Sequence, residues 1–272
     1  MATEVVAPAK INLTLHVTGQ RADGYHLLDS LVVFAELGDR MRFEPAERMS
    51  LQVTGRFAEG VPGDARNLAW RAAELAGVTL RIGLEKILPH GAGIGGGSSD
   101  AAAVLRSFGG ADHAARLGAD VPVCLSDAPQ RMRGIGDVLD RVPGVPALPL
   151  VLVNPAVHVP TPAVFQILTQ KTNEGMGALP SWTSPAAFLS WLGDQSNDLE
   201  GPAITTAPAI GDALQALGGT PGCRLARMSG SGATCFGIYD SEDAARAAVA
   251  EIATAHPGWW VQATHSIGSA TA

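Results

Sequence analysis

The sequence has few of the residues that mark secreted, membrane-bound or nucleic-acid-binding proteins. Its three cysteines, Cys124, Cys223 and Cys235, show no metal-binding or redox spacing, and an odd number of thiols is expected of a reducing, cytoplasmic location. The net charge is −7 and Lys and Arg form no cluster, so we expect no nucleic-acid partner. The longest apolar stretch, residues 142–159, contains four prolines and cannot form a membrane helix.

Lysine is also scarce, because Lys10, Lys86 and Lys171 stand against sixteen arginines. A small, flexible ammonium group can do work that a planar guanidinium group cannot. A lysine that is retained in such a chain is therefore a candidate for a specific function.

The pattern of apolar residues predicts an α+β protein of two halves with a cleft between them. Alternating apolar residues indicate mainly strands before about residue 145, whereas helices mixed with strands follow it. Among these elements we expect strands over 27–36 and 40–44, a helix from about Ser99 to Ser107, and a strand from Val121 to Leu125.

A glycine-rich segment, Gly91-Ala-Gly-Ile-Gly-Gly-Gly-Ser-Ser99, stands directly before an alanine-rich helical pattern. The start of a helix carries unpaired backbone N–H groups and about half a positive charge, and glycine lets a ligand approach the backbone closely. Phosphate is the natural ligand of such a place. We therefore predict an anion-binding loop, and a simple glycine turn with a serine cap is the alternative.

Two familiar phosphate-loop templates fit this segment poorly. The run from Gly91 to Gly96 matches the dinucleotide pattern G-x-G-x-x-G, but it comes late in the chain, and a helix rather than a second strand follows. Gly91 and Gly96 also have the spacing of a Walker loop, but Gly97 stands where its essential lysine belongs. Neither template therefore explains the segment.

Asp100 follows the two serines, in the first turn of the predicted helix. A carboxylate there stabilises the helix dipole by about 0.3–1 kcal/mol. The same charge would repel phosphates unless the side chain caps the helix or faces Mg²⁺. We expect helix capping.

Four further motifs combine strand or turn residues with polar side chains. They are Pro8-Ala-Lys-Ile-Asn12, Asp23-Gly-Tyr-His26, Leu117-Gly-Ala-Asp-Val-Pro122 and Ser229-Gly-Ser-Gly232. Lys10 and Asn12 lie on one side of a predicted strand, and Asp120 stands at the start of another. Taken singly, each motif also has a simpler interpretation as a solvated strand face, a turn or a hairpin loop.

Together these motifs and the glycine–serine loop resemble the kinase superfamily of galactokinase, homoserine kinase, mevalonate kinase and phosphomevalonate kinase, the GHMP kinases. The resemblance covers most of the chain, with Ile94 in place of the more usual leucine. It implies a two-domain α+β architecture. A ribosomal-protein-S5-domain-2-like, ATP-binding N-terminal domain would span residues 1–145, and a ferredoxin-like, substrate-side C-terminal domain would span residues 146–272.

One branch of this superfamily has the Asp-Gly-Tyr-His turn, and the segments Val159–Phe165 and Asn197–Glu200 are similar to that branch too. The resemblance implies ATP-dependent phosphorylation of the 2-hydroxyl of a methylerythritol that carries cytidine diphosphate. This reaction would belong to the non-mevalonate route to isoprenoid precursors. The resemblance also implies a monomer or weak homodimer with no nucleic-acid or membrane partner.

The resemblance assigns catalysis to Lys10 and Asp120. Asp120 would take the proton from the substrate hydroxyl, and Lys10 would keep that carboxylate ionised. Mg²⁺, whose protein ligands the resemblance leaves open, would bridge phosphate oxygens of ATP. The ATP-binding residues would be Pro89, Gly91, Gly93, Gly95, Gly96, Gly97, Ser98, Ser99 and, from a weaker match, Asn67.

The resemblance likewise implies a set of substrate-binding residues. Tyr25 and Phe165 would stack on the two faces of the cytosine, and His26 would read its hydrogen-bonding edge. Asn12 and Thr161 would contact the remainder of the substrate.

Two other functions stay open. Another GHMP kinase, acting on homoserine or mevalonate, would not explain the Asp-Gly-Tyr-His turn or Phe165. A non-catalytic nucleotide-binding relative is the second alternative, because the stretch from Leu105 to Leu117 is shorter than the family pattern and Val123-Cys124 replaces an aromatic pair.

Overall fold

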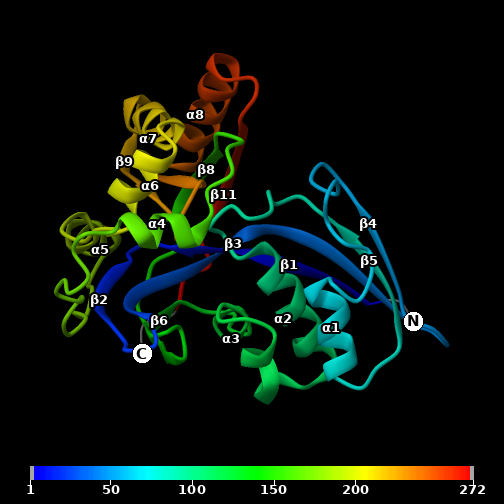
Figure 1. Ribbon diagram of the computed structural model, residues 1–272. Coiled ribbons are helices and arrows are strands. Elements are labelled where there is room, and N and C mark those ends of the chain that lie inside the picture. The colour runs from blue at the N-terminus through cyan, green and yellow to red at the C-terminus, as the bar shows by residue number, and fades with distance from the viewer. Residues whose placement is uncertain (1–2, 270–272) are drawn as a thin grey trace. The chain divides into compact units, whose positions relative to one another are not determined.

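The computed structural model describes residues 3–269 of an α+β protein (Figure 1). The chain forms two compact units. Unit 1 contains the chain up to Lys10, Glu36–His90 and Gly95–Asp127, and unit 2 contains Ile11–Ala35, Gly91–Ile94 and the chain from Ala128. Because the units are interleaved in the sequence, the domain boundary near residue 145 stays a prediction.

Unit 1 is built from part of a mixed sheet and the helices packed against it. Its strands come from β1 (Thr3–Asn12), β3 (His26–Pro45), β4 (Ser50–Thr54) and β5 (Leu80–Glu85). Strand β5 pairs antiparallel with β3 and parallel with β4, and β1 pairs with β3. Its helices are α1 (Leu68–Leu75), α2 (Gly96–Phe108), the 3₁₀ helix η1 (Ala111–Arg116) and α3 (Val121–Cys124).

The two strands expected over 27–36 and 40–44 form the single long strand β3. Within it Met41 and Phe43 are buried, whereas Arg40 and Arg42 are exposed. This alternation places one face of the strand against the core and the other in water.

The strand expected from Val121 to Leu125 is wrong, because these residues form the short helix α3. The backbone N–H of Cys124 donates to the carbonyl of Asp120, and that of Leu125 donates to Pro122. Proline is well placed in the first turn of a helix, where its missing N–H is not needed. A short apolar run alone does not distinguish a buried strand from a buried helix.

Unit 2 contains the other part of the mixed sheet and a separate four-stranded sheet. In the first, β2 (His16–Gln20) and β6 (Gln130–Gly134) pair with β3, and β7 (Val138–Arg141) pairs with β6. The second has the antiparallel order β11-β8-β10-β9, formed by β8 (Pro149–Asn154), β9 (Cys223–Met228), β10 (Cys235–Tyr239) and β11 (Trp260–His265).

Five helices belong to unit 2: α4 (Thr161–Ile167), α5 (Pro185–Gly193), α6 (Glu200–Thr206), α7 (Ala209–Gly219) and α8 (Glu242–Ala255). Helix α7 precedes β9, and α8 connects β10 to β11, so the second sheet follows the β-α-β-β-α-β order of a ferredoxin-like fold. This confirms the predicted C-terminal fold. Within residues 3–269, no helix has both the length and the apolar character needed to cross a membrane.

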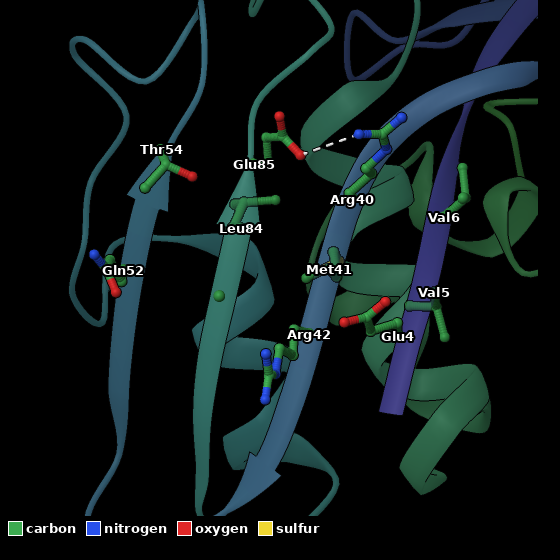
Figure 2. A pocket seen from close by; sticks show the side chains of 11 residues that line it. Glu4, Val5, Val6, Arg40, Met41, Arg42, Gln52, Thr54, Leu84 and Glu85 are labelled. Carbon is green, nitrogen blue, oxygen red and sulfur yellow. Dashed lines mark ion pairs between the residues drawn. The ribbon is translucent and has the colours of Figure 1, made fainter. Parts of the chain in front are cut away.

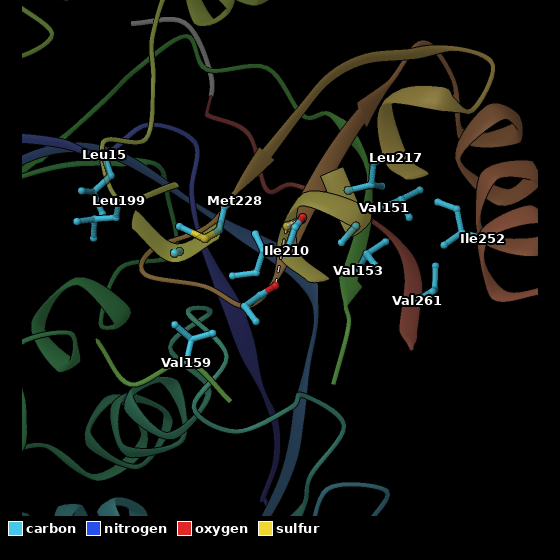
Figure 3. Packing of buried hydrophobic residues seen from close by; sticks show 14 of the residues in the cluster. Leu15, Val151, Val153, Val159, Leu199, Ile210, Leu217, Met228, Ile252 and Val261 are labelled. Atoms are coloured by element: carbon cyan, nitrogen blue, oxygen red, sulfur yellow. Dashed lines mark hydrogen bonds between the residues drawn. The ribbon is translucent and has the colours of Figure 1, made fainter. Parts of the chain in front are cut away.

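The core of unit 2 lies between one face of this sheet and the helices α7 and α8 (Figure 3). Val151 and Val153, two residues apart on β8, point to the same face and pack in one cluster with Leu217 of α7 and Ile252 of α8. Burying such side chains stabilises the fold by about 1.5–3 kcal/mol each. The cluster thereby fixes the sheet whose β9–β10 turn takes part in the candidate site.

Replacing Ile252, which is 2% exposed, should test this packing. Ile252→Ala should lower the free energy of unfolding by about 2–5 kcal/mol, because it removes buried methylene groups and leaves a cavity. Ile167→Ala, at a position 44% exposed, is the matched control and should cost much less. If urea titrations show that both variants lose the same free energy of unfolding, the packing described here is wrong.

Candidate active site

The second half of the glycine–serine loop leads directly into α2. Gly95 has a left-handed backbone with φ of 64°, and no side chain caps the helix that begins at Gly96. The first intrahelical bond of this turn runs from the N–H of Ser99 to the carbonyl of Gly95. The N–H groups before it have no carbonyl one turn earlier. Such a helix end can bind an anion, and the anion-binding loop stays a prediction.

The first half of the loop is packed against the Ser229–Gly232 turn of unit 2. A Cβ atom on Gly93 would lie 2.5 Å from the carbonyl oxygen of Ser229 and 2.8 Å from that of Gly232. Gly93 also has a φ of 76°, so only glycine fits this position. The Ser229 hydroxyl donates to the carbonyl of Gly93 at 3.1 Å. The turn therefore holds the loop in place, a role that the hairpin interpretation missed.

Lys10 and Asp120 form an ion pair in unit 1, although 110 positions separate them. Lys10 Nζ lies 2.8 Å from Asp120 Oδ2, and the side chains are 5% and 41% exposed respectively. A Cβ atom on Gly95 would lie 3.2 Å from Lys10 Cβ, so the loop passes directly beside the lysine. The pair thus places an accessible carboxylate and a buried ammonium next to the start of α2.

Asp100 does not cap α2, so the capping prediction is wrong. Its carboxylate is buried and accepts a hydrogen bond from Lys86 Nζ at 2.8 Å. Lys86 also donates to Asp39, which accepts the backbone N–H groups of Ile87 and Leu88 at 2.6 and 2.9 Å. These contacts join β3, the end of β5 and the N-terminal part of α2.

The charges of this cluster shift the pKa values of two of its members. Burial raises the pKa of Asp100 to about 7, and Asp39 adds to the rise while Lys86 opposes it. For Lys86, burial lowers the pKa, but the two carboxylates outweigh burial and the pKa is raised overall. The lysine is therefore charged at neutral pH, whereas Asp100 can gain or lose its proton there.

Two of the predicted cytosine-binding residues contact each other in unit 2. The rings of His26 and Phe165 are stacked, with centroids 4.6 Å apart and an interplanar angle of 20°. Burial and the nearby Lys171 lower the pKa of His26, so its ring is neutral at pH 7. Within residues 3–269 its buried Nε2 atom has no hydrogen-bond partner. Tyr25 is 62% exposed, and its stacking on cytosine opposite Phe165 stays a prediction.

Asn12 and Thr161 are held by serine hydroxyls. Asn12 Nδ2 donates to Ser30 at 2.8 Å, while its buried Oδ1 has no partner among the described residues. The Thr161 hydroxyl lies 2.7 Å from that of Ser231. Asn197 Nδ2 donates to the carbonyl of Met228, at the end of β9, and to that of Gly230 in the same Ser-Gly turn. Ser231 and Asn197 were not predicted as site residues, although both lie in motifs that the sequence analysis identified.

Asn67 serves as the N-cap of α1. Its side-chain oxygen accepts the N–H of Ala69 at 2.9 Å, and its amide donates to the carbonyl of Pro62 at 2.9 Å. This explains the residue structurally, and its contact with adenosine stays a prediction.

A pocket of about 550 Å³ lies on the sheet of unit 1 (Figure 2). Its walls come from β1, β3, β4 and β5, with Arg40, Arg42, Gln52 and Thr54 among the side chains around it, and its lining includes none of the predicted site residues. This pocket is therefore separate from the predicted site residues.

Comparison with known proteins shows the family to which this chain belongs. The family model described as "GHMP kinases N terminal domain" matches residues 66–126, and the one described as "GHMP kinases C terminal" matches residues 177–258. The structure of a homoserine kinase from Cytophaga hutchinsonii is 18% identical, with a TM-score of 0.67 over 99% of this chain and 96% of its own. At this identity the similarity shows the fold alone. The chain belongs to the GHMP kinase family.

The more similar relatives are of one kind within this family. A protein of Dinoroseobacter shibae is 56% identical over 95% of this chain and 93% of its own, and one of Paracoccus denitrificans is 54% identical over 95% and 94%. Both are named 4-diphosphocytidyl-2-C-methyl-D-erythritol kinase. A crystal structure of 4-(cytidine 5'-diphospho)-2C-methyl-D-erythritol kinase is 35% identical, with a TM-score of 0.80 over 98% of this chain and 100% of its own.

Gly93→Ala should test the packing of the loop. It should lower the free energy of unfolding by more than about 1 kcal/mol, because a left-handed backbone is strained for alanine and its Cβ would overlap two carbonyls. Gly97→Ala is the matched control, since its Cβ would meet only the side chain of Leu68 at 3.8 Å. The control should raise stability by about 0.4–1 kcal/mol. If thermal unfolding shows that both substitutions are tolerated, the loop is not packed as described.

Proposed function

We propose that this protein transfers the γ-phosphoryl group of ATP to the 2-hydroxyl of 4-(cytidine 5'-diphospho)-2-C-methyl-D-erythritol, in the non-mevalonate route to isoprenoid precursors. The observation that carries the proposal is the Lys10–Asp120 pair, with its contact at 2.8 Å beside the uncapped start of α2. The names of the relatives at more than half identity support the choice of substrate.

Phosphoryl transfer requires mainly positioning and charge neutralisation from the protein. The unpaired N–H groups at Gly96 and Gly97 would hold phosphate oxygens of ATP, with the remainder of the loop from Pro89 to Ser99 shaping their surroundings. Gly95, which has no side chain, leaves room beside Lys10. These features fit a polyphosphate.

Mg²⁺ would neutralise charge on the phosphate oxygens when it is bound. Residues 3–269 contain no group of three His, Cys, Asp or Glu side chains placed to hold a metal ion. Magnesium in kinases keeps several waters and is bound by few carboxylates together with substrate phosphates. The composition of the site therefore fits an ion that arrives with ATP.

Asp120 would act as the general base. Its partly exposed carboxylate can reach a substrate hydroxyl, accept its proton and so generate the attacking oxygen. The buried ammonium of Lys10 would hold Asp120 in place and stabilise the negative charge that develops on that oxygen.

The cytidine group would be bound by unit 2. The stacked rings of His26 and Phe165 offer an aromatic surface, and Tyr25 would cover the other face of the base. His26 Nε2 and Asn12 Oδ1, which have no hydrogen-bond partner among the described residues, would bind polar groups of the substrate. Thr161 would contact the substrate through its hydroxyl.

Two alternatives are less well supported. A homoserine or mevalonate kinase would leave the Tyr25, His26 and Phe165 group without a function. A non-catalytic relative would have no need for the Lys10–Asp120 pair. The shortened stretch before Leu117, which motivated this alternative, is folded as the end of α2 and as η1.

We also propose that the enzyme works in the cytoplasm as a monomer or weak homodimer. The net charge of −7 argues against a nucleic-acid partner.

The proposed activity can be tested directly. The purified protein is mixed with Mg-ATP and the cytidine substrate, and mass spectrometry should find a product that is heavier by one phosphoryl group. Homoserine and mevalonate serve as control substrates. Phosphorylation of a control substrate in preference to the cytidine compound would refute the substrate assignment.

Asp120→Asn and Lys10→Met should each reduce kcat by about 10²–10⁴, because each removes part of the general-base pair. Both variants should keep the far-ultraviolet circular dichroism spectrum of the parent protein. Asp194→Asn, which changes an exposed carboxylate at the end of α5, is the matched control and should leave kcat unchanged. Full activity in either pair variant would exclude the proposed mechanism.

Tyr25→Ala should raise the KM for the cytidine substrate about tenfold or more, since a stacked aromatic ring contributes about 1–3 kcal/mol to binding a base. The KM for ATP should change little. Tyr25→Phe, which keeps the ring, is the control and should behave like the parent protein. Equal weakening of both substrates in Tyr25→Ala would argue against the stacking role.

A further inference from the structure

The buried cluster of Asp39, Lys86 and Asp100 lies directly against the phosphate-binding end of α2. A Cβ atom placed on Gly96, the first residue of the helix, would be 3.5 Å from both Lys86 Nζ and Asp39 Oδ2. The three charged residues are each no more than 2% exposed. Their charges therefore act on the first turn of α2 with little screening by water.

The carboxylates of this cluster are not equivalent. Asp39 accepts hydrogen bonds from Lys86 and from two backbone N–H groups. Asp100 accepts one hydrogen bond, through Oδ2, and its buried Oδ1 has no partner within the described chain. One ammonium cannot neutralise two carboxylates, so any excess negative charge of the cluster resides on Asp100.

Asp100 directly follows the first turn of α2, Gly96–Ser99, so that excess charge would lie within about one turn of the bound phosphates. An ionised Asp100 repels a bound polyphosphate, whereas a protonated Asp100 leaves the cluster neutral and still bonded to Lys86. Binding of the nucleotide and of a proton at Asp100 must then favour each other, because linkage is reciprocal.

We propose that Asp39 and Lys86 are positioning residues that hold the start of α2, and that ATP binds with a proton taken up by Asp100. The inference rests on the proposed function, since it assumes that the loop binds ATP. The charged groups that act on Asp100 within the described residues are Lys86 after β5 and Asp39 on β3. The thiol of Cys124 on α3 also interacts electrostatically with Asp100. Burial raises the pKa of this thiol to about 12, so the thiol stays neutral near pH 7.

The expected pH dependence follows from the pKa of Asp100, which is about 7 in the free protein. Below that pH the residue is already protonated, and binding needs no further proton. Above it, the affinity should fall as pH rises, by up to tenfold per pH unit, until the pKa of the bound form is passed.

The test is calorimetric binding of a non-hydrolysable ATP analogue with Mg²⁺ between pH 6 and 8.5. Asp100→Asn should remove the protein's part of the pH dependence, so the ratio of parent to variant affinity should fall about threefold to tenfold across this range. Protonation of the nucleotide itself cancels in that ratio. Asp112→Asn, in η1, is the matched control and should follow the parent protein.

A second measurement uses the unmodified protein, so the test does not depend on folding of the variant. At pH 8, infrared difference spectra should show a protonated carboxyl band that grows when the analogue is added. A parent-to-variant ratio that is independent of pH, or no such band, overturns the proton linkage while leaving the kinase assignment intact. Failure of the analogue to bind at any pH overturns both.

Discussion

Close approach of the backbone at two glycines is the constraint on which the candidate site depends. In unit 2, Gly93 lies against the carbonyls of Ser229 and Gly232, where no Cβ atom fits. In unit 1, Gly95 turns the chain into α2 through a left-handed conformation and lies against Lys10. The glycines are therefore required by packing alone, and a loop with side chains could not take this path.

Two of the three lysines that this chain retains are buried beside carboxylates, with different consequences. Lys10 has one partner, Asp120, which is 41% exposed and can meet a substrate. Lys86 has two partners, and because both are buried neither can contact a substrate. The same type of contact thus leaves an accessible carboxylate in one place, where we propose a general base, and an internal support in the other. Solvent exposure of the carboxylates makes the difference.

Much of this arrangement could be predicted from the sequence. A helix after the loop was expected from about Ser99, and it begins three residues earlier, at Gly96. The ferredoxin-like order follows from the family resemblance. The assignment of Lys10 and Asp120 as a pair also depended on that resemblance. No local pattern connects residues 110 positions apart.

Other features could not be predicted for identifiable physical reasons. Asp100 was expected to cap α2, but it turns into the protein because Lys86 supplies a buried countercharge. The scarcity of lysine marked Lys86 as a candidate for a specific function, but it did not indicate which carboxylates Lys86 would contact. The short apolar run at Val121 was assigned to a strand because its length alone cannot distinguish strand from helix, and the stacking of His26 on Phe165 depends on tertiary packing.

The central claim is that a phosphoryl group is transferred to one particular hydroxyl of the cytidine-linked substrate. The most direct measurement is phosphorus NMR of the reaction product made from substrate labelled with ¹³C at the carbon that bears the 2-hydroxyl. The account predicts a new phosphomonoester signal that is split by coupling to that carbon. A new phosphomonoester signal without this coupling, or release of inorganic phosphate alone, would contradict it.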